Sequence, residues 1–464
     1  MATISTSNVT SGFIDLATFD EIEKYLYGGP DSTAYFVRDT RKATWFTQVP
    51  VVLSRASGNP AFGQEWSVSI SRAGDYLLQT WLRVTTPEVE LLTGNQYQAN
   101  GRIRWTRNFM HNLIRECCIT FNDLVAARFD NYHLDFWSAF TVPAGKRTGY
   151  NNMIGNFDGM TAGSPPGPEH KIQSNTLNLP LPFFFTRDSG VALPTAALPY
   201  NDMRISCAFR EWNQLLVLTN SQAVDGINPH TTPTIPQDIA VAPVLGTTQV
   251  WANYAIVSND ERKRMACAPR DILIEQVQTA PRQTFNPAQN KVPSFDCRFS
   301  HAIKVLFFSV RNTTTPGCWS NYTAASPVHT QGVLDFSPDH AVDPILQTSI
   351  LYENTQRIAT MGSDYFSLVN PWYHAPAIPC ETGYHEYSYS LDFMCCDPMG
   401  STNYGKLTNV SMVPEASEGA HTGSTAAGVL GQGTDHPQSY EFIVTAIDNN
   451  IIRISGGALG FPVL

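Results

Sequence analysis

The sequence of 464 residues is poor in charge. Only 15% of its residues are Asp, Glu, Lys or Arg, whereas about a quarter is usual for soluble domains. A large chain with so few charged residues has less solvated surface than normal. This composition fits extensive contacts between subunits, although an ordinary all-β protein can share it, so charge content favours large interfaces without establishing them.

The sequence also lacks the features of membrane-spanning and secreted proteins. No apolar stretch approaches the roughly 20 residues that a membrane-spanning helix needs. The first residues, Met1 to Asn8, contain neither a basic region nor an apolar core, so we expect no secretory signal. The cysteines are odd in number and include two adjacent pairs, which predicts reduced thiols in a cytosolic setting. They are Cys117, Cys118, Cys207, Cys267, Cys297, Cys318, Cys380, Cys395 and Cys396.

Clusters of basic residues are also scarce. The net charge is −10, whereas proteins that bind nucleic acid need clustered Lys and Arg to contact phosphates. The densest basic run is Arg262 to Arg264, and acidic residues precede it. We therefore expect no direct contact with nucleic acid.

Sequence motifs for catalysis or metal binding are absent. The 11 histidines are scattered, and none stands at a metal-binding spacing from another His or Cys. The sequence contains neither a Gly-x-Ser-x-Gly elbow nor a phosphate-binding Gly-Lys-Ser/Thr motif. We therefore predict no catalytic residue, no cofactor site and no metal site.

One group of acids and tyrosines leaves an enzymatic alternative open. Paired carboxylates among aromatic side chains are typical of glycosidase clefts, although acids at strand edges among tyrosines are far more common. The group consists of Asp364, Glu381 and Glu386 with Tyr365, Tyr384 and Tyr387.

Alternation of apolar and polar residues predicts an all-β protein. The 31 Gly and 31 Pro indicate many turns between strands. Residues 116–121 and 124–128 predict a hairpin, because Asn122 and Asp123 tolerate the positive φ angles of a two-residue turn. Further strands are predicted at 65–71, 76–84, 249–257, 272–277, 303–310, 386–394 and 440–447, and helices at 132–140 and 258–265.

Polar, proline-rich stretches divide the chain into four parts. We predict an N-terminal arm at 1–45, a first β domain at 46–218, a linker at 219–243 and a second β domain at 244–464. In the arm, Thr18 and Glu21 have the spacing of a capping box before a helix with an apolar stripe that includes Ile22 and Leu26. Long loops are predicted at 148–174, 311–343, 370–382 and 414–437.

A proline-rich segment carries the most specific pattern in the chain. Residues 181–185 read Leu-Pro-Phe-Phe-Phe, and residues 190–194 read Gly-Val-Ala-Leu-Pro. Prolines at this density exclude a helix. The segment resembles one near the end of the first jelly roll in major capsid proteins of large double-stranded DNA viruses. Short stretches similar to iridovirus major capsid proteins occur in the same order along the whole chain, at 10–18, 58–66, 71–76, 150–156, 273–278, 397–403 and 450–457.

The resemblance implies a fold and a role. An iridovirus-type major capsid protein has two tandem jelly rolls (antiparallel β-sandwiches) with long loops and a few short helices. It forms pseudo-hexagonal homotrimers that tile the icosahedral shell of the virion, is assembled in the host cytoplasm, and contacts minor capsid proteins and an inner viral membrane. One alternative is a minor or receptor-binding virion protein on the same fold. The other is a β-sandwich carbohydrate-binding protein or glycosidase. The residues predicted to support assembly are Ile22, Leu26, Phe183, Phe184, Phe185, Leu193 and Pro194.

Overall fold

The computed structural model describes residues 3–93, 101–220, 230–324, 342–425 and 437–462. The chain forms two compact units, residues 1–45 and 46–464, which we call the arm and the body. The arm contains two helices, α1 (Thr3–Ala17) and α2 (Glu21–Leu26). No helix in the described part of the chain is long and apolar enough to cross a membrane.

The predicted helix of the arm is present, but its cap was misplaced. The residue that precedes α2 is Asp20, and its N–H donates to Glu23 Oε2 at 3.2 Å. The hydroxyl of Thr18, the predicted cap, donates instead to the Asp15 carbonyl at 2.6 Å. The capping box is therefore shifted by two residues, because Asp20 is followed three positions later by a glutamate just as Thr18 is.

The body begins with a β-sandwich whose strands pair antiparallel. One sheet has the order β1 (Phe46–Val52), β14 (Thr248–Val257), β4 (Tyr76–Thr85) and β10 (Thr176–Pro180). The other has the order β2 (Ser54–Ser57), β3 (Glu65–Ser69), β11 (Met203–Phe209), β7 (Ile114–Phe121) and β8 (Leu124–Phe129). The predicted hairpin is β7–β8, and Asn122 and Asp123 have φ angles of 49° and 65°, as its turn requires.

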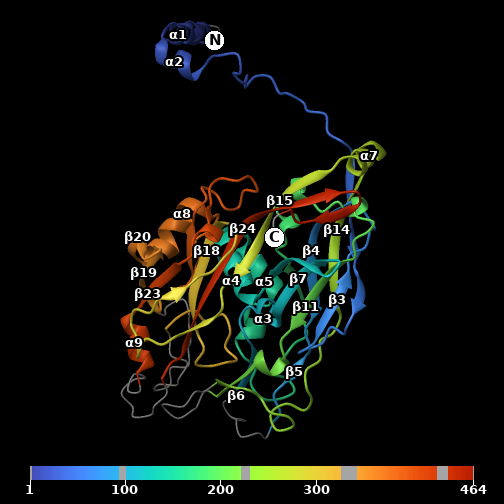
Figure 1. Ribbon diagram of the computed structural model, residues 1–464, viewed down its shortest axis with the longest axis vertical. Helices are drawn as coiled ribbons and strands as arrows, with labels where there is room; N and C mark the ends of the chain where they lie inside the picture. Colours follow the sequence, from blue (N-terminus) through green and yellow to red (C-terminus); the bar gives the residue numbers. More distant parts are fainter. Residues whose placement is uncertain (1–2, 94–100, 221–229, 325–341, 426–436, 463–464) are drawn as a thin grey trace. The chain divides into compact units, whose positions relative to one another are not determined.

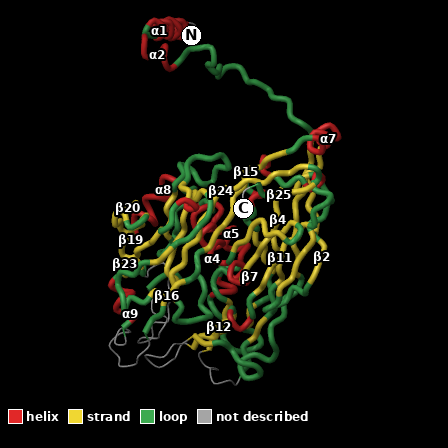
Figure 2. The backbone as a smooth tube through the Cα atoms, viewed as in Figure 1, coloured by secondary structure: helices red, strands yellow, loops and turns green. Residues whose placement is uncertain are grey.

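A second sandwich follows. Its larger sheet has the order β15 (Arg270–Thr279), β24 (Tyr440–Ser455), β18 (Ala302–Asn312) and β21 (His385–Ser388), with β16 (Gln283–Phe285), β22 (Thr402–Asn403) and β25 (Ala458–Gly460) paired beside this path. Its smaller sheet has the order β17 (Phe295–Asp296), β23 (Val410–Ala416), β19 (Ile345–Tyr352) and β20 (Thr355–Gly362). Two small sheets complete the described strands, β13 (His230–Thr231), β12 (Leu216–Asn220) and β6 (Gly101–Trp105), and β5 (Val89–Glu90) with β9 (Lys171–Ile172). Strands dominate the body, which confirms the all-β prediction (Figure 2).

Short helices lie between the two sandwiches and at their ends (Figure 1). In the middle of the body are α3 (Phe109–Leu113), α4 (Asn131–Thr141) and α5 (Ala144–Ile154), and elsewhere are α6 (Asp158–Thr161), α7 (Asn259–Cys267), α8 (Asn370–His374) and α9 (Glu418–Ser424). The helices predicted at 132–140 and 258–265 are confirmed as α4 and α7. Single turns follow several strands, including η1 (Phe184–Thr186), η2 (Ser189–Val191), η3 (Thr195–Ala197), η4 (Trp212–Gln214), η7 (Tyr404–Lys406) and the π-helical turn η6 (Tyr365–Val369).

Four sequence-based assignments were wrong in part. The loop predicted at 148–174 contains most of α5 and all of α6. The strand predicted at 386–394 ends at Ser388, and α8 opens the loop predicted at 370–382. The described part of the loop predicted at 414–437 contains the end of β23 and all of α9. The rest of that loop, and parts of the loop predicted at 311–343 and of the linker at 219–243, lie outside the described residues.

Strand pairing bears on the division between the two β domains. β14 follows the predicted linker, yet it pairs with β1 and β4 of the first sandwich. The four-part division stays a prediction, and the pairing favours a boundary after Val257, because a strand belongs with the sheet that satisfies its backbone hydrogen bonds.

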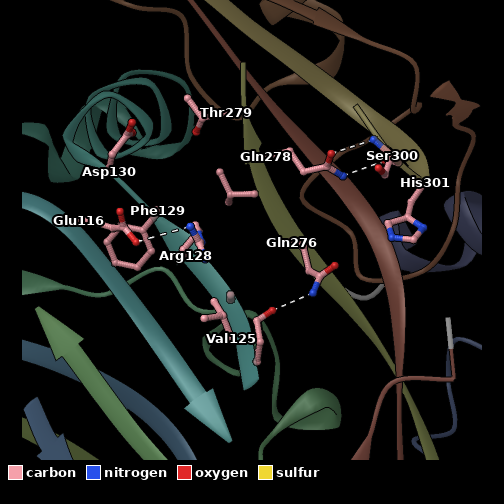
Figure 3. A pocket seen from close by; sticks show the side chains of 13 residues that line it. Glu116, Val125, Arg128, Phe129, Asp130, Gln276, Gln278, Thr279, Ser300 and His301 are labelled. Carbon is pink, nitrogen blue, oxygen red and sulfur yellow. Dashed lines mark hydrogen bonds and ion pairs between the residues drawn. The ribbon is translucent and has the colours of Figure 1, made fainter. Parts of the chain in front are cut away.

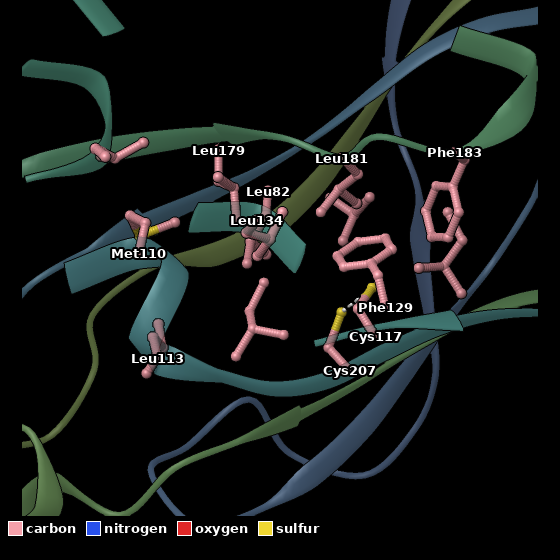
Figure 4. Close-up of a cluster of buried hydrophobic side chains, with 14 of the residues drawn as sticks. Leu82, Met110, Leu113, Cys117, Phe129, Leu134, Leu179, Leu181, Phe183 and Cys207 are labelled. Atoms are coloured by element: carbon pink, nitrogen blue, oxygen red, sulfur yellow. Dashed lines mark hydrogen bonds between the residues drawn. The ribbon is translucent and has the colours of Figure 1, made fainter. Parts of the chain in front are cut away.

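Two apolar cores fill the body. The larger one lies inside the first sandwich and continues across the junction to residues of the second sandwich such as Phe307 and Ile447. The smaller one lies inside the second sandwich. Figure 4 shows part of the larger core, where Cys117 and Cys207 face each other from β7 and β11 with their sulfur atoms 3.3 Å apart and no disulfide between them.

Candidate functional site

The two predicted assembly residues of the arm are exposed. The exposed fraction is 73% for Ile22 and 69% for Leu26, and Phe13 and Ile14 of α1 are similarly uncovered. Exposed apolar surfaces are typical of interaction sites. The arm therefore presents an apolar surface that its own two helices do not cover.

The other predicted assembly residues are buried within the body. Phe183, Phe184, Phe185 and Leu193 are each at most 3% exposed, and Pro194 is also buried. The Phe185 ring packs against Phe183 and Phe184, and Phe183 also packs against Phe129. Their part in assembly stays a prediction, and such a part would act through the position of the segment 186–191 rather than by direct contact.

A second exposed apolar surface lies around α8 and was missed in the sequence. We call it the α8 patch, and it consists of Leu368, Val369, Trp372, Tyr373 and Leu391. Trp372 and Tyr373 are 72% and 73% exposed, and a hydrogen bond of 3.0 Å from His374 Nδ1 to the Leu391 carbonyl holds the two segments together. The many apolar residues at 366–373, which lie within and beside a predicted loop, could have indicated this surface from the sequence.

The helix α4 joins the two sandwiches through aromatic side chains. The ring of Phe307 on β18 stacks on Phe140 and Phe136 of α4, with ring centres 5.3 and 6.1 Å apart. Tyr322 and Tyr384 from the second sandwich also contact Phe136. Because all five rings are buried and such pairs add to simple burial, the two sandwiches share one packed junction.

A buried polar network centred on Asp135 crosses the same junction. Its Oδ2 accepts from the hydroxyls of Tyr322 at 2.7 Å and Ser320 at 2.9 Å, which both belong to the second sandwich. Its Oδ1 lies 2.7 Å from His111 Nδ1, and His111 Nε2 lies 2.6 Å from the Tyr150 hydroxyl. A buried carboxylate is tolerated when all its neighbours hydrogen-bond to it, so this network fixes α3, α4 and α5 against the second sandwich.

A buried ion cluster forms a third connection. Glu275 on β15 pairs with Lys304 on β18 and, at 3.2 Å, with Arg187 from the first sandwich. Arg187 also lies flat on the Trp137 ring, with its Cζ atom 3.6 Å from the ring centre. Loss of Glu275 would leave two buried cations without a counter-charge, so the cluster ties the position of the 183–187 segment to the second sandwich.

A polar cleft of about 600 Å³ lies between β8 and β15 (Figure 3). The Gln276 side chain donates to the Ala126 carbonyl at 2.7 Å across it, and Gln278 exchanges two hydrogen bonds with Ser300. These bonds are made within the chain, and the cleft contains no group of acids and histidines with the geometry of a catalytic or metal site. Among the residues that the structure describes, no group of three or more His, Cys, Asp or Glu has the arrangement that holds a metal ion.

The acids of the enzymatic alternative do not form an open carboxylate pair. Glu386 is fully buried without a hydrogen-bond partner, and burial raises its pKa to about 8. Glu381 forms an ion pair with Arg107, and Asp364 is exposed at the start of η6. Since a glycosidase needs two carboxyl groups that both face the substrate, this arrangement does not support the alternative.

Solved structures define the class of the fold. A chain of the PBCV-1 virus capsid matches with a TM-score of 0.71 and 20% sequence identity. The match covers 93% of this chain and 100% of the PBCV-1 chain. The Faustovirus major capsid protein matches with a TM-score of 0.70 and 12% identity over 92% and 93% of the two chains. The body therefore has the double jelly-roll fold of virus capsid proteins, as the resemblance implied.

Sequence relatives identify the family. A model described as the N-terminus of the major capsid protein matches residues 34–257, and one described as the major capsid protein of large eukaryotic DNA viruses matches 261–460. The major capsid protein of Costelytra zealandica iridescent virus is 65% identical over 99% of this chain and 100% of its own length. That of Frog virus 3 is 45% identical over the full length of both chains. The chain belongs to the family of iridovirus and other large-DNA-virus major capsid proteins.

Proposed function

We propose that this protein builds the shell of an iridovirus-like virion as a homotrimer with a pseudo-hexagonal outline. Its role is structural and needs no catalysis or cofactor. Three copies bring six jelly rolls together, and neighbouring trimers then tile an icosahedral shell in the virion. The full-length identity to major capsid proteins carries this proposal.

The junction of the body supports a role as a rigid building block. Interfaces between domains that are small and polar allow domain motion, whereas large apolar ones do not. Here an aromatic stack, the Asp135 network and the Glu275 ion cluster all join the two sandwiches. Two jelly rolls locked in one orientation suit a capsomer whose outline must repeat throughout a shell.

The exposed apolar surfaces are the proposed contact sites. We assign the α8 patch to contacts with further copies of this chain, and the apolar surface of the arm, including Ile22 and Leu26, to minor capsid proteins or the inner membrane. The large side chains of Trp372 and Tyr373 are of the type enriched at the centres of interfaces. The net charge of −10 argues against direct contact with the genome.

The solution mass of the purified full-length protein tests the proposal. A particle of about three times 51.3 kDa, or about 154 kDa, with a hexagonal outline in negative stain supports the trimer. We expect W372A to weaken association, either between the subunits of a trimer or between trimers. Y200A is the control, because it removes an aromatic ring that is 76% exposed and lies outside the patch, and it should leave association unchanged. A monomer at all concentrations, in the presence of other virion proteins as well, would contradict it.

A further inference from the structure

A largely apolar hollow opens between the first sheet of the body and the helices α4 and α5. Its volume is about 690 Å³, which lies within the range of pockets that hold small molecules. Trp81 from β4 and Trp137 from α4 supply two of its walls, with Met153 and Leu181 beside them. The hollow shares no residue with the arm or the α8 patch, so it is separate from the proposed assembly surfaces.

Two polar groups with free donors line this apolar hollow. The Arg187 side chain is only 8% exposed, and only its Nη2 atom has a partner, Glu275, whereas Nε and Nη1 have no acceptor. The hydroxyl of Thr80 is also buried without a partner. Buried donors are normally paired, so these N–H and O–H groups are available to an acceptor placed in the hollow.

The charge balance around Arg187 favours an anion. Two cations, Arg187 and Lys304, share the single carboxylate of Glu275. Burial raises the pKa of the nearby Asp448 to about 7, so that carboxyl does not supply a full negative charge at neutral pH. The cluster therefore keeps an excess of positive charge, in a setting of low dielectric constant where charges interact strongly.

We propose that the hollow binds a carboxylic acid with a long apolar chain, of the fatty-acid class. Its carboxylate accepts hydrogen bonds from the free N–H groups of Arg187, and its chain lies along Trp81, Trp137 and Leu181. A neutral hydrocarbon leaves the arginine donors without an acceptor, and a small inorganic anion leaves the apolar walls uncovered. The positive charge of Arg187 and the apolar walls thus select one kind of ligand.

Calorimetric titration of the full-length protein with dodecanoate, below its micelle concentration, tests the site. Methyl dodecanoate is the matched ligand because it keeps the chain and removes the charge. R187Q is the main variant, since it leaves the neutral Glu275–Lys304 pair behind, and R83Q, at an exposed arginine of β4 that does not line the hollow, is its control. M153W places a larger side chain at the partly exposed rim of the hollow.

The site predicts one dodecanoate per chain. We expect binding to weaken by about tenfold to a hundredfold in R187Q, as for the loss of a charge-assisted hydrogen bond, and by a similar factor for the methyl ester, with no change in R83Q. M153W should weaken binding of the acid and of the ester alike, because it narrows the hollow that holds the chain. Absence of binding, equal affinity for acid and ester, or unchanged affinity in R187Q would overturn the proposal. If R187Q does not fold, the comparison of acid and ester on the unmodified protein decides.

Discussion

The arm and the body use the same kinds of apolar residue in opposite ways. In the arm, Phe13, Ile22 and Leu26 are mostly exposed, whereas Phe136 and Phe183 in the body are almost completely buried. Burial of such side chains is the main favourable term in folding, so the body gains stability from them within one chain. The arm gains none from the exposed ones until another surface covers them. The comparison separates residues that fold the chain from residues available to assemble it.

The largest expected effect breaks the packing of the body. F136A removes a ring that contacts Phe307, Tyr322 and Tyr384 at the junction, and should lower the free energy of unfolding by about 3–5 kcal/mol. Denaturant unfolding followed by tryptophan fluorescence measures it. L26A in the arm is the matched variant and should change the same quantity by less than about 0.5 kcal/mol. Equal effects of the two variants would remove the distinction between arm and body.

A buried acid gives the body a pH-dependent stability. Burial raises the pKa of Glu386 to about 8, from an ordinary value of 4.5. Between these two pH values the folded state keeps the proton and the unfolded state releases it, so stability falls by about 1.4 kcal/mol per pH unit as the pH rises. E386Q removes this slope and should be more stable than the unmodified protein at pH 8, by a few kcal/mol.

Unfolding curves from pH 5 to 8 test this expectation. The difference between the unmodified protein and E386Q isolates Glu386. Burial raises the pKa of Asp448 to about 7, and this residue adds a fall in stability with rising pH to both proteins alike. E21Q, at an exposed glutamate of the arm, is the control and should run parallel to the unmodified protein. An E386Q curve that also runs parallel would show that Glu386 is ionised in the folded body.

A smaller effect should follow from loss of one hydrogen bond at the junction. Y322F removes the hydroxyl that donates to Asp135 Oδ2 at 2.7 Å, while Ser320 still donates to the same oxygen. We expect stability to fall by about 1–3 kcal/mol, as for a hydrogen bond to a charged group. Y25F in the arm, where the tyrosine is 89% exposed, should leave thermal unfolding unchanged. A Y322F protein as stable as its parent would show that the network does not hold the two sandwiches together.

The smallest expected effect on stability is in the arm. The double variant I22S/L26S replaces side chains that are 73% and 69% exposed, so the free energy of unfolding should stay within about 0.5 kcal/mol. Assembly with minor capsid proteins or membrane should nevertheless be lost in a co-expression and particle-sedimentation assay. Normal particles formed by this variant would exclude these two residues as contact sites.

Local signals in the sequence predicted those elements whose formation depends on neighbouring residues. The β7–β8 hairpin follows from two residues, Asn122 and Asp123, that tolerate positive φ, and α4 follows from its apolar spacing. The helix α5 was missed because it contains two glycines and two asparagines, which have low helix propensity. It is held by contacts that a local pattern does not reveal, including the bond between Tyr150 and His111.

The candidate sites divide in the same way. The arm stripe of Ile22 and Leu26 was visible as a helical spacing, and its exposure agrees with a contact surface without establishing one. From the sequence, the phenylalanines at 183–185 could belong either to a core or to a subunit contact. Hydrophobicity alone does not distinguish burial within the chain from burial by another protein. The bond between Asp135 and Tyr322 joins positions 187 residues apart, so no local pattern points to the junction.

A cryo-electron microscopy map of the particles that this chain forms in infected cells tests the central claim most directly. We predict capsomers of three copies, each with two jelly rolls fixed as in the body, and arms whose Ile22 and Leu26 side chains are covered by another protein or by membrane. Capsomers with another number of copies, or ordered arms that leave these side chains in solvent, would contradict the proposed division between a body that folds alone and an arm that serves assembly.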